Sequence, residues 1–279
     1  MIHKDYKRLY ANATKEYSPK FKRELQEQIN EFCATLNYNA ISGAGIEKTI
    51  KDLHYSLGVK MAFISYRDVR RQVKKSIFYY EAKNVFTDIW KSVIYGYLDK
   101  KGLSKLVKDI TDTTKEQIRR FLIKSQEENL TLPESVKLLQ KSGITNYRAE
   151  LIARTETGRA ANLGSVVGAV STGLVTDKMW ISTMDSRTRR TPPDEFDHYD
   201  MDGVTIPMDE YFSLYSKEGG AELMLHPCDD NGSAANVCNC RCTIGYQIKR
   251  DNNNNPLKYE NNVPKGDIGT IWATLVALM

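Results

Sequence analysis

The residues best suited to chemistry in this chain are cysteines and histidines in its last third. Within 45 residues the sequence holds His198, His226, Cys228, Cys238, Cys240 and Cys242. Thiolate and imidazole are the ligands that tetrahedral zinc prefers. Alternate side chains of a strand share a face, so Cys240 and Cys242 are expected to reach one ion. Cys238 joins them if the strand begins early enough, and Cys228 or His198 would close the site.

The cysteine pattern also allows interpretations without metal. No Cys-x-x-Cys pair is present, and cysteine is a common small buried residue. Buried thiols, or a disulfide formed after cell lysis, are therefore the alternatives to zinc. The total of five cysteines is odd and does not suit a secreted disulfide framework, which favours synthesis in a reducing cytoplasm.

A carboxylate, a cation and a general base are also present in this region. Asp185, Arg187 and His198 would suit hydrolysis or phosphoryl chemistry if they lay on one side of a sheet. No phosphate-binding glycine loop and no nucleophile with its base accompanies them. We therefore favour a structural interpretation, in which Asp185, Arg187 and Arg241 form an ion-pair network that fixes loops. Arg154 and Glu156 are likewise expected to form helix-surface or interdomain pairs.

The elements that must position these residues differ between the two halves of the chain. Apolar residues at three- and four-residue spacing predict helices over 13–36 and 43–129, with breaks at the glycines near 43–45 and at Gly102. Capping-box patterns predict helix starts at Thr113 and Thr131. A long helix is predicted over 146–171, where Ala160, Gly164 and Gly168 leave a groove for another backbone.

After residue 173 the pattern changes to short β-prone segments. Strands are predicted over 178–183, 203–207 and 243–248, and they favour a small antiparallel sheet packed on the long helix. The polar run 251–256 is expected to be a loop, and the apolar tail from Ile268 to Met279 suits docking into a groove of this chain or of a partner. The predicted class is α+β, with a helical region 1–108, a helix-plus-sheet domain 109–248, and a linker with a docking tail 249–279.

Charge is distributed unevenly along the chain. Residues 1–110 carry 21 Lys and Arg against 12 Asp and Glu, a net charge of +9, whereas the remainder carries 19 against 23, a net charge of −4. This bias favours an acidic partner for the N-terminal part, either DNA or an acidic protein surface. The alternative is a solvated helix face. With no run of eighteen apolar residues and no apolar signal segment, we expect a soluble protein with no membrane span.

Four sequence features occur together in a fixed order. They are the lead around residues 113–136, the helix segment 148–164, the Trp-to-Gly segment 178–203, and the closing Asn-Cys-Arg-Cys at 239–242. Together they resemble the Mu F-like head morphogenesis domain of minor head proteins in tailed phages. The residues that carry the resemblance are Arg154, Glu156, Trp180, Asp185, Arg187, His198, Asp202, Gly203, Asn239 and Arg241.

The resemblance implies a low-copy structural protein of the virion, without catalytic activity, that supports head assembly or genome delivery. It implies a place inside the capsid at the portal vertex, with the host cytoplasm as the site of assembly. The implied partners are the portal protein, other head proteins and packaged double-stranded DNA. Many members carry Cys-x-x-Cys where this chain has Arg189 to Pro193, which argues against a four-cysteine metal site. The alternatives are a zinc-assisted hydrolase or toxin-like effector, and a DNA-binding packaging protein.

Overall fold

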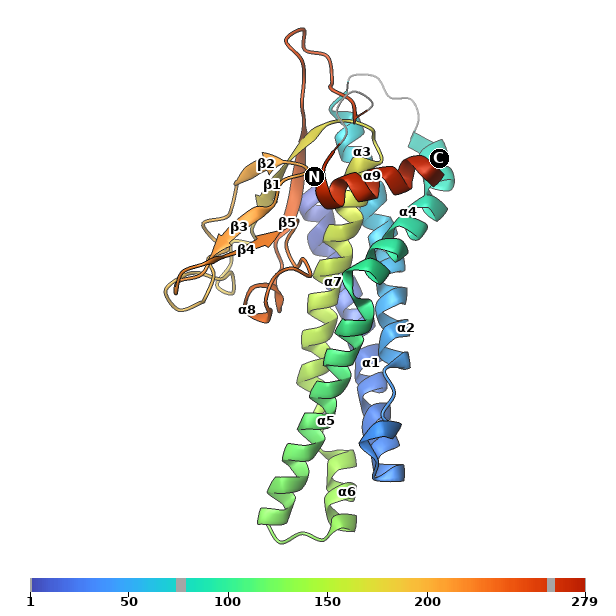
Figure 1. The fold of residues 1–279 in the computed structure, drawn as a ribbon, viewed down its shortest axis with the longest axis vertical. Coiled ribbons are helices and arrows are strands. Elements are labelled where there is room, and N and C mark those ends of the chain that lie inside the picture. Colours follow the sequence, from blue (N-terminus) through green and yellow to red (C-terminus); the bar gives the residue numbers. More distant parts are fainter. Residues whose placement is uncertain (1, 74–78, 260–263, 279) are drawn as a thin grey trace.

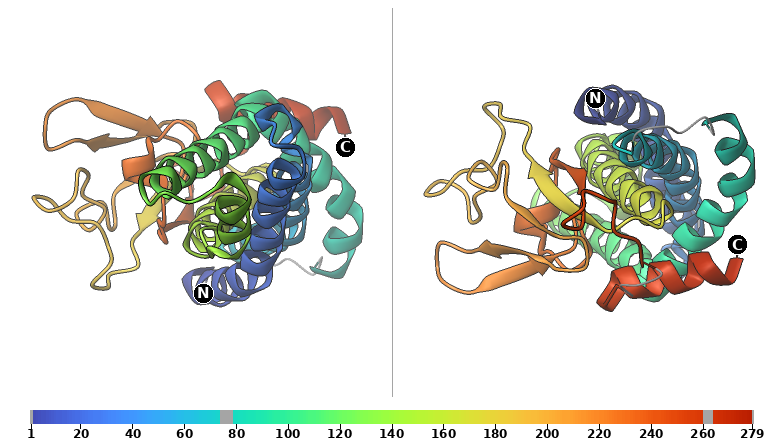
Figure 2. Two further views of the ribbon diagram at one scale, coloured as in Figure 1. Left: turned by 90° about the horizontal axis from the view of Figure 1, so that it is seen from below. Right: turned by 90° about the horizontal axis from the view of Figure 1, so that it is seen from above.

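Long helices form one side of the molecule and a small β-layer the other (Figures 1 and 2). The computed structural model describes residues 2–73, 79–259 and 264–278. Its class is α+β, as predicted from the sequence, with helices first and an antiparallel sheet after them. The expected helix across residues 74–78 and the tail residues 260–263 and 279 lie outside the described part.

The first helix is longer than predicted, and the predicted helical region 43–129 is interrupted after Arg71 as well as at Gly102. The first begins at Ile2 instead of residue 13 and accommodates Pro19. A π-helical turn, η2 (His54–Gly58), joins α2 to α3 without a break. The elements are α1 (Ile2–Thr35), η1 (Tyr38–Ala40), α2 (Ala44–Leu53), α3 (Val59–Arg71) and α4 (Tyr79–Lys101).

The helical hairpin α5 (Leu103–Glu127) and α6 (Leu132–Lys141) extends from one end of the molecule (Figure 1). Gly102 precedes α5 with φ 95°, so the predicted break there is confirmed. The capping box at Thr131 is also confirmed, because Glu134 accepts hydrogen bonds from the Thr131 backbone and hydroxyl. The predicted helix start at Thr113 is wrong. Its hydroxyl donates to Asp109 O inside α5, which local sequence cannot distinguish from a cap.

The helix α7 (Thr145–Val170) lies at the centre of the molecule and contacts α1, α3 and α4. Almost its whole circumference from Thr155 onward is buried. Small residues permit this close packing: a Cβ added at Gly164 would lie 2.1 Å from Gly58 O, and one at Gly168 would lie 2.0 Å from Ala62 O. The predicted groove for another backbone is therefore filled by η2 and α3 of the same chain.

Over the ranges that the structure describes, five strands make two antiparallel units. The three-stranded sheet has the order β2-β1-β5, and a separate hairpin is formed by β3 and β4. Lys178 of β1 pairs with Ile206 on one side and Tyr246 on the other. The hairpin was not predicted from the sequence, because its two strands have only four residues each. The strands are β1 (Thr176–Ile181), β2 (Thr205–Pro207), β3 (Phe212–Tyr215), β4 (Ala221–Met224) and β5 (Thr243–Ile248).

One buried cluster joins both halves of the chain. It includes Tyr6 of α1, Trp90 of α4, Val167 of α7, Trp180 of β1 and Ile271 of α9 (Gly266–Leu278). The apolar face of α9 lies on α4 and α7. The predicted boundary between residues 108 and 109 falls within α5, and the main core extends across it. Within the described ranges, every helix is too short or too polar to cross a bilayer.

Candidate functional site

Three of the predicted metal ligands meet in the β-layer. His198 Nδ1 lies 3.5 Å from Cys240 Sγ and 3.7 Å from Cys242 Sγ. In the part of the chain that the structure describes, these three form the one group of three or more His, Cys or acidic ligands whose atoms all lie within 4.8 Å of one another, and all three are buried. We call them the thiol–imidazole cluster. The Cys240 side chain and burial raise the pKa of Cys242 well above its usual range.

A relay of hydrogen bonds fixes the imidazole of this cluster. His198 Nε2 lies 2.5 Å from Asn236 Oδ1, and Asn236 Nδ2 donates to Glu222 Oε2 over 3.0 Å. A carboxylate only accepts, so the amide nitrogen of Asn236 must face Glu222 and its oxygen must face the ring. The proton of neutral His198 is therefore on Nε2, and the Nδ1 lone pair faces the two thiols.

Residues of the resemblance motif hold this loop against the sheet. Trp180 is fully buried and meets the His198 ring edge to face, with centroids 5.4 Å apart. The Ser182 hydroxyl donates to His198 O, and the Ser182 N–H donates to Asp202 over 2.8 Å. Gly203 has φ 82° and donates to Trp180 O, a conformation that favours glycine. The Asp-Gly pair is therefore a turn that secures β1.

The remaining predicted thiol ligands divide between two places. Cys228 is buried beside Cys240, and hydrogen bonding between their side chains raises the pKa of Cys240. Cys238 is half-buried and turned away, because it ends the short helix α8 (Ala234–Val237) and does not belong to a strand. The condition under which Cys238 would join the site, a strand that begins before it, is not met, since β5 begins at Thr243. His226 is buried elsewhere, beside Asp229, and burial lowers its pKa.

Asp185 and Arg241 form a two-bond ion pair. Arg241 Nη2 donates to Asp185 Oδ1 over 2.6 Å and Nη1 donates to Asp185 Oδ2. Arg187 takes part through its backbone N–H, which donates to the same carboxylate over 2.9 Å. The hydrogen bonds from Arg241 hold the pKa of Asp185 well below its usual range. The negative charge of Asp185 is thus compensated by Arg241, and the pair fixes a loop.

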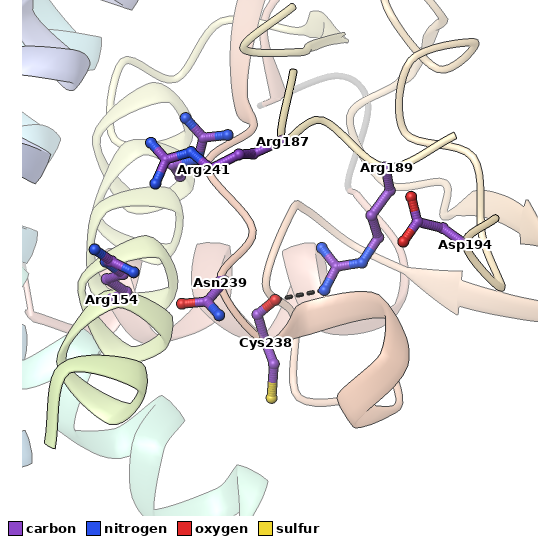
Figure 3. Close-up of a pocket in the computed structure, with 7 residues that line it drawn as sticks. All are labelled: Arg154, Arg187, Arg189, Asp194, Cys238, Asn239 and Arg241. Atoms are coloured by element: carbon purple, nitrogen blue, oxygen red, sulfur yellow. Dashed lines mark hydrogen bonds between the residues drawn. The ribbon is translucent and has the colours of Figure 1, made fainter. Parts of the chain in front are cut away.

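Arginines converge on a pocket outside this ion pair (Figure 3). The cavity has a volume of about 240 Å³ and is lined by Arg154, Arg187, Arg189, Asp194, Cys238, Asn239 and Arg241. We call it the arginine pocket. Because Arg154 pairs with Glu150 and Arg241 with Asp185, the excess positive charge that favours anions in the pocket comes from Arg187 and Arg189. Arg189 also donates to Cys238 O, while Asn239 has φ 58° and donates from its backbone to Thr155.

The two motif residues on α7 have different surroundings. Arg154 pairs with Glu150 one turn away at the surface, whereas Glu156 is buried between His54 and Arg159. Burial alone would raise the pKa of Glu156, but the charge of Arg159 and the contacts of His54 outweigh it and lower the pKa. Arg159 also pairs with Asp230 over 2.7 Å. Sequence reasoning missed this buried network because His54 and Asp230 are far in the chain from Glu156 and Arg159.

A buried lysine was also missed. Lys178 of β1 is completely buried, donates to Leu225 O over 2.8 Å and lies over the Phe212 ring. Burial lowers its pKa to about 7. The alternation of β1 offered the signal, because Thr176, Lys178 and Trp180 share one face of the strand and all three are buried.

Comparison with known proteins identifies the region that holds both sites. The model of the family described as "Phage Mu protein F like protein" matches residues 83–245. A protein of Enterococcus faecalis named NAD(+)--arginine ADP-ribosyltransferase EFV is similar, with 28% identity over 163 residues, which are 54% of this chain. The chain thus spans about a third, 31%, of the length of this relative. No solved structure matches the chain.

The family match covers more than half of the chain and includes α7, β1 to β4, the first half of β5 and every residue of the resemblance motif. The Mu F-like resemblance is confirmed, and the chain belongs to the family of phage Mu F-like head morphogenesis proteins.

Proposed function

We propose that the chain is a minor head protein of a tailed phage or prophage. It is a low-copy structural component inside the capsid at the portal vertex, assembled in the host cytoplasm, and it supports head assembly or genome delivery. The observation that carries the proposal is the family match over residues 83–245. The motif residues support it, because most of them make contacts that hold the β-layer together, such as the Asp185 and Arg241 ion pair.

The surfaces of the molecule indicate where partners would bind. The arginine pocket continues onto α1 as a neighbouring cavity, in which five cationic side chains, among them Lys7 and Lys15, outnumber the carboxylates of Glu150 and Asp185. Such a surface favours acidic groups, either carboxylates of the portal protein or phosphates of the packaged double-stranded DNA. We propose the portal and other head proteins as the main partners, and DNA as a second one.

Co-purification with the portal protein tests the proposal. The full chain and its portal protein, taken from the same phage or prophage genome, are expressed together, and one carries an affinity tag. The chain is expected to be retained with the portal and to be present at low copy number in purified particles by mass spectrometry. Absence from particles together with failure to bind the portal would contradict the proposal.

An effector enzyme carried in the capsid is the second candidate, and the named activity of the Enterococcus faecalis relative is the observation that favours it. The match covers 31% of that relative, so its activity is not transferred to this chain. Labelled NAD⁺ with an arginine-containing acceptor protein tests transferase activity. Nuclease and peptidase assays with added zinc, on wild type and His198→Ala, test zinc-assisted hydrolysis. Product formation that requires this chain, in the transferase assay or in the hydrolase assays, would favour the effector-enzyme hypothesis.

A further inference from the structure

The thiol–imidazole cluster has the dimensions of a metal site. Zinc–sulfur bonds of about 2.3 Å and zinc–nitrogen bonds of about 2.0–2.1 Å place the nitrogen and sulfur ligands of a tetrahedral ion about 3.5 Å apart. His198 Nδ1 lies 3.5 Å from Cys240 Sγ and 3.7 Å from Cys242 Sγ. The single lone pair of Nδ1 can accept from only one of the two thiols, and the other acceptor near Cys242 Sγ is Ser182 Oγ at the longer distance of 3.8 Å.

The environment of His198 is also that of a metal ligand. A metal-binding histidine donates its second ring N–H to a neighbouring acceptor, which fixes the tautomer and the ring orientation. Asn236 supplies that acceptor at 2.5 Å, and Glu222 orients Asn236 over 3.0 Å. Both His198 and Asn236 are buried, and Glu222 at the outer end of the relay is half-buried.

Cys228 is the candidate for the fourth ligand. Its Sγ lies more than 4.8 Å from at least one of the other three ligand atoms, so it would have to turn toward them when the ion binds. It is buried, its thiol lies 3.5 Å from Cys240 O, and its side chain contacts that of Cys240. Gly158 leaves room for it, because a Cβ there would lie 2.6 Å from Cys228 Sγ. Three soft thiolates and one imidazole favour zinc over harder cations.

We propose that His198, Cys240 and Cys242, with Cys228 as the fourth ligand, bind one zinc ion in a closed structural site. The ion would connect three segments, namely the loop between β1 and β2, the turn after β4, and the stretch that leads into β5. Structural zinc contributes directly to the folding free energy, and this layer has only short strands to stabilise it. The inference depends on these contacts and does not rest on the proposed role in the phage head.

Metal analysis of the full chain, purified without a metal-binding tag or chelator, tests the proposal. Wild type is expected to contain about one zinc per chain, and Cys240→Ser and Cys242→Ser are expected to contain almost none. Cys238→Ser and Cys33→Ser are the matched controls and are expected to retain it, because neither thiol belongs to the cluster. Equal zinc loss in Cys238→Ser, or wild type without zinc and with free thiols or a disulfide by mass spectrometry, would overturn the proposal.

A second measurement does not depend on variants that may fail to fold. Wild type loaded with Co²⁺ is expected to show the absorption bands of tetrahedral thiolate coordination, and octahedral bands would overturn the assignment. Asn236→Ala retains all four ligands, and it is expected to bind zinc about 10–100-fold more weakly in chelator competition, because the imidazole loses its orienting acceptor. An unchanged zinc affinity would contradict the role of Asn236 in orienting His198 as a ligand.

Discussion

The thiol–imidazole cluster and the arginine pocket share one short segment but have opposite properties. From Cys238 to Cys242, the two cysteines Cys240 and Cys242 face the buried cluster, while Asn239 and Arg241 line the pocket. One side is closed, and it contains thiols and an imidazole. The other side is open to solvent and dominated by guanidinium groups. One short motif thus contributes to a buried cluster on one side and to a charged pocket on the other, and substitutions should separate the two.

Removal of the indole behind the cluster should have the largest effect on the buried side. Trp180→Ala is expected to lower the free energy of unfolding by about 3–5 kcal/mol, because it leaves a large cavity between His198 and Phe212. Urea unfolding followed by circular dichroism measures the loss. Tyr215→Ala is the control, because this β3 side chain is 72% exposed and should change stability by less than about 0.5 kcal/mol. Comparable losses in both variants would contradict the description of the core.

The buried lysine makes the same side sensitive to pH. The folded-state pKa of Lys178, about 7, is below its ordinary value, so between the two values the unfolded chain binds more protons. The free energy of unfolding should therefore rise with pH above about 7, by at most about 1.4 kcal/mol per pH unit. Urea titrations from about pH 7 to about pH 9 measure the rise. The slope of the free energy of unfolding against pH should be smaller in Lys178→Met. A slope equal to that of wild type would mean that another group causes the rise.

The ion pair at the edge of the pocket should have a smaller effect. The Asp185 side chain is 39% exposed, so Asp185→Asn is expected to cost roughly 1 kcal/mol or less at pH 7. Because Arg241 depresses the Asp185 pKa, the stabilisation is present above the ordinary carboxyl pKa and is lost as pH falls through the lower folded value. Acid titration should thus be shallower in Asp185→Asn. The control variant Asp88→Asn, at an exposed carboxylate, should lose stability with falling pH as wild type does. An equal change in both variants would contradict a stabilising role for the Asp185–Arg241 pair.

Substitutions in the arginine pocket should change ligand binding and have little effect on the free energy of unfolding. Arg187→Ala is expected to change the free energy of unfolding by less than about 0.5 kcal/mol. If DNA binds at the arginine pocket, the variant should reduce the slope of log affinity against log salt by about 1. Fluorescence anisotropy with double-stranded DNA at several salt concentrations measures it. Arg120→Ala on α5, outside the pocket, is the control. An equal decrease of the salt slope in this variant would mean that DNA is attracted by the net charge of the protein and does not bind at the pocket.

Patterns within one element could be predicted from the sequence. The three sheet strands, the long α7 and the start of α6 follow from alternation, helical spacing and a local cap. The start predicted at Thr113 was wrong because a hydroxyl inside a helix gives the same pattern as a cap. The grouping of His198 with Asn236 and Glu222 could not be predicted, because it depends on the unpredicted β3–β4 hairpin and on the four-residue helix α8.

The contact of Gly164 and Gly168 with Gly58 and Ala62 has a practical consequence for work on this family. Both partner residues precede residue 83, where the family match begins. A fragment trimmed to the matched segment would therefore leave the central helix with a bare groove in water and without the backbone that fills it. We expect such a fragment to aggregate or to lose fixed side-chain packing, so the first three helices need to be retained when the domain is expressed.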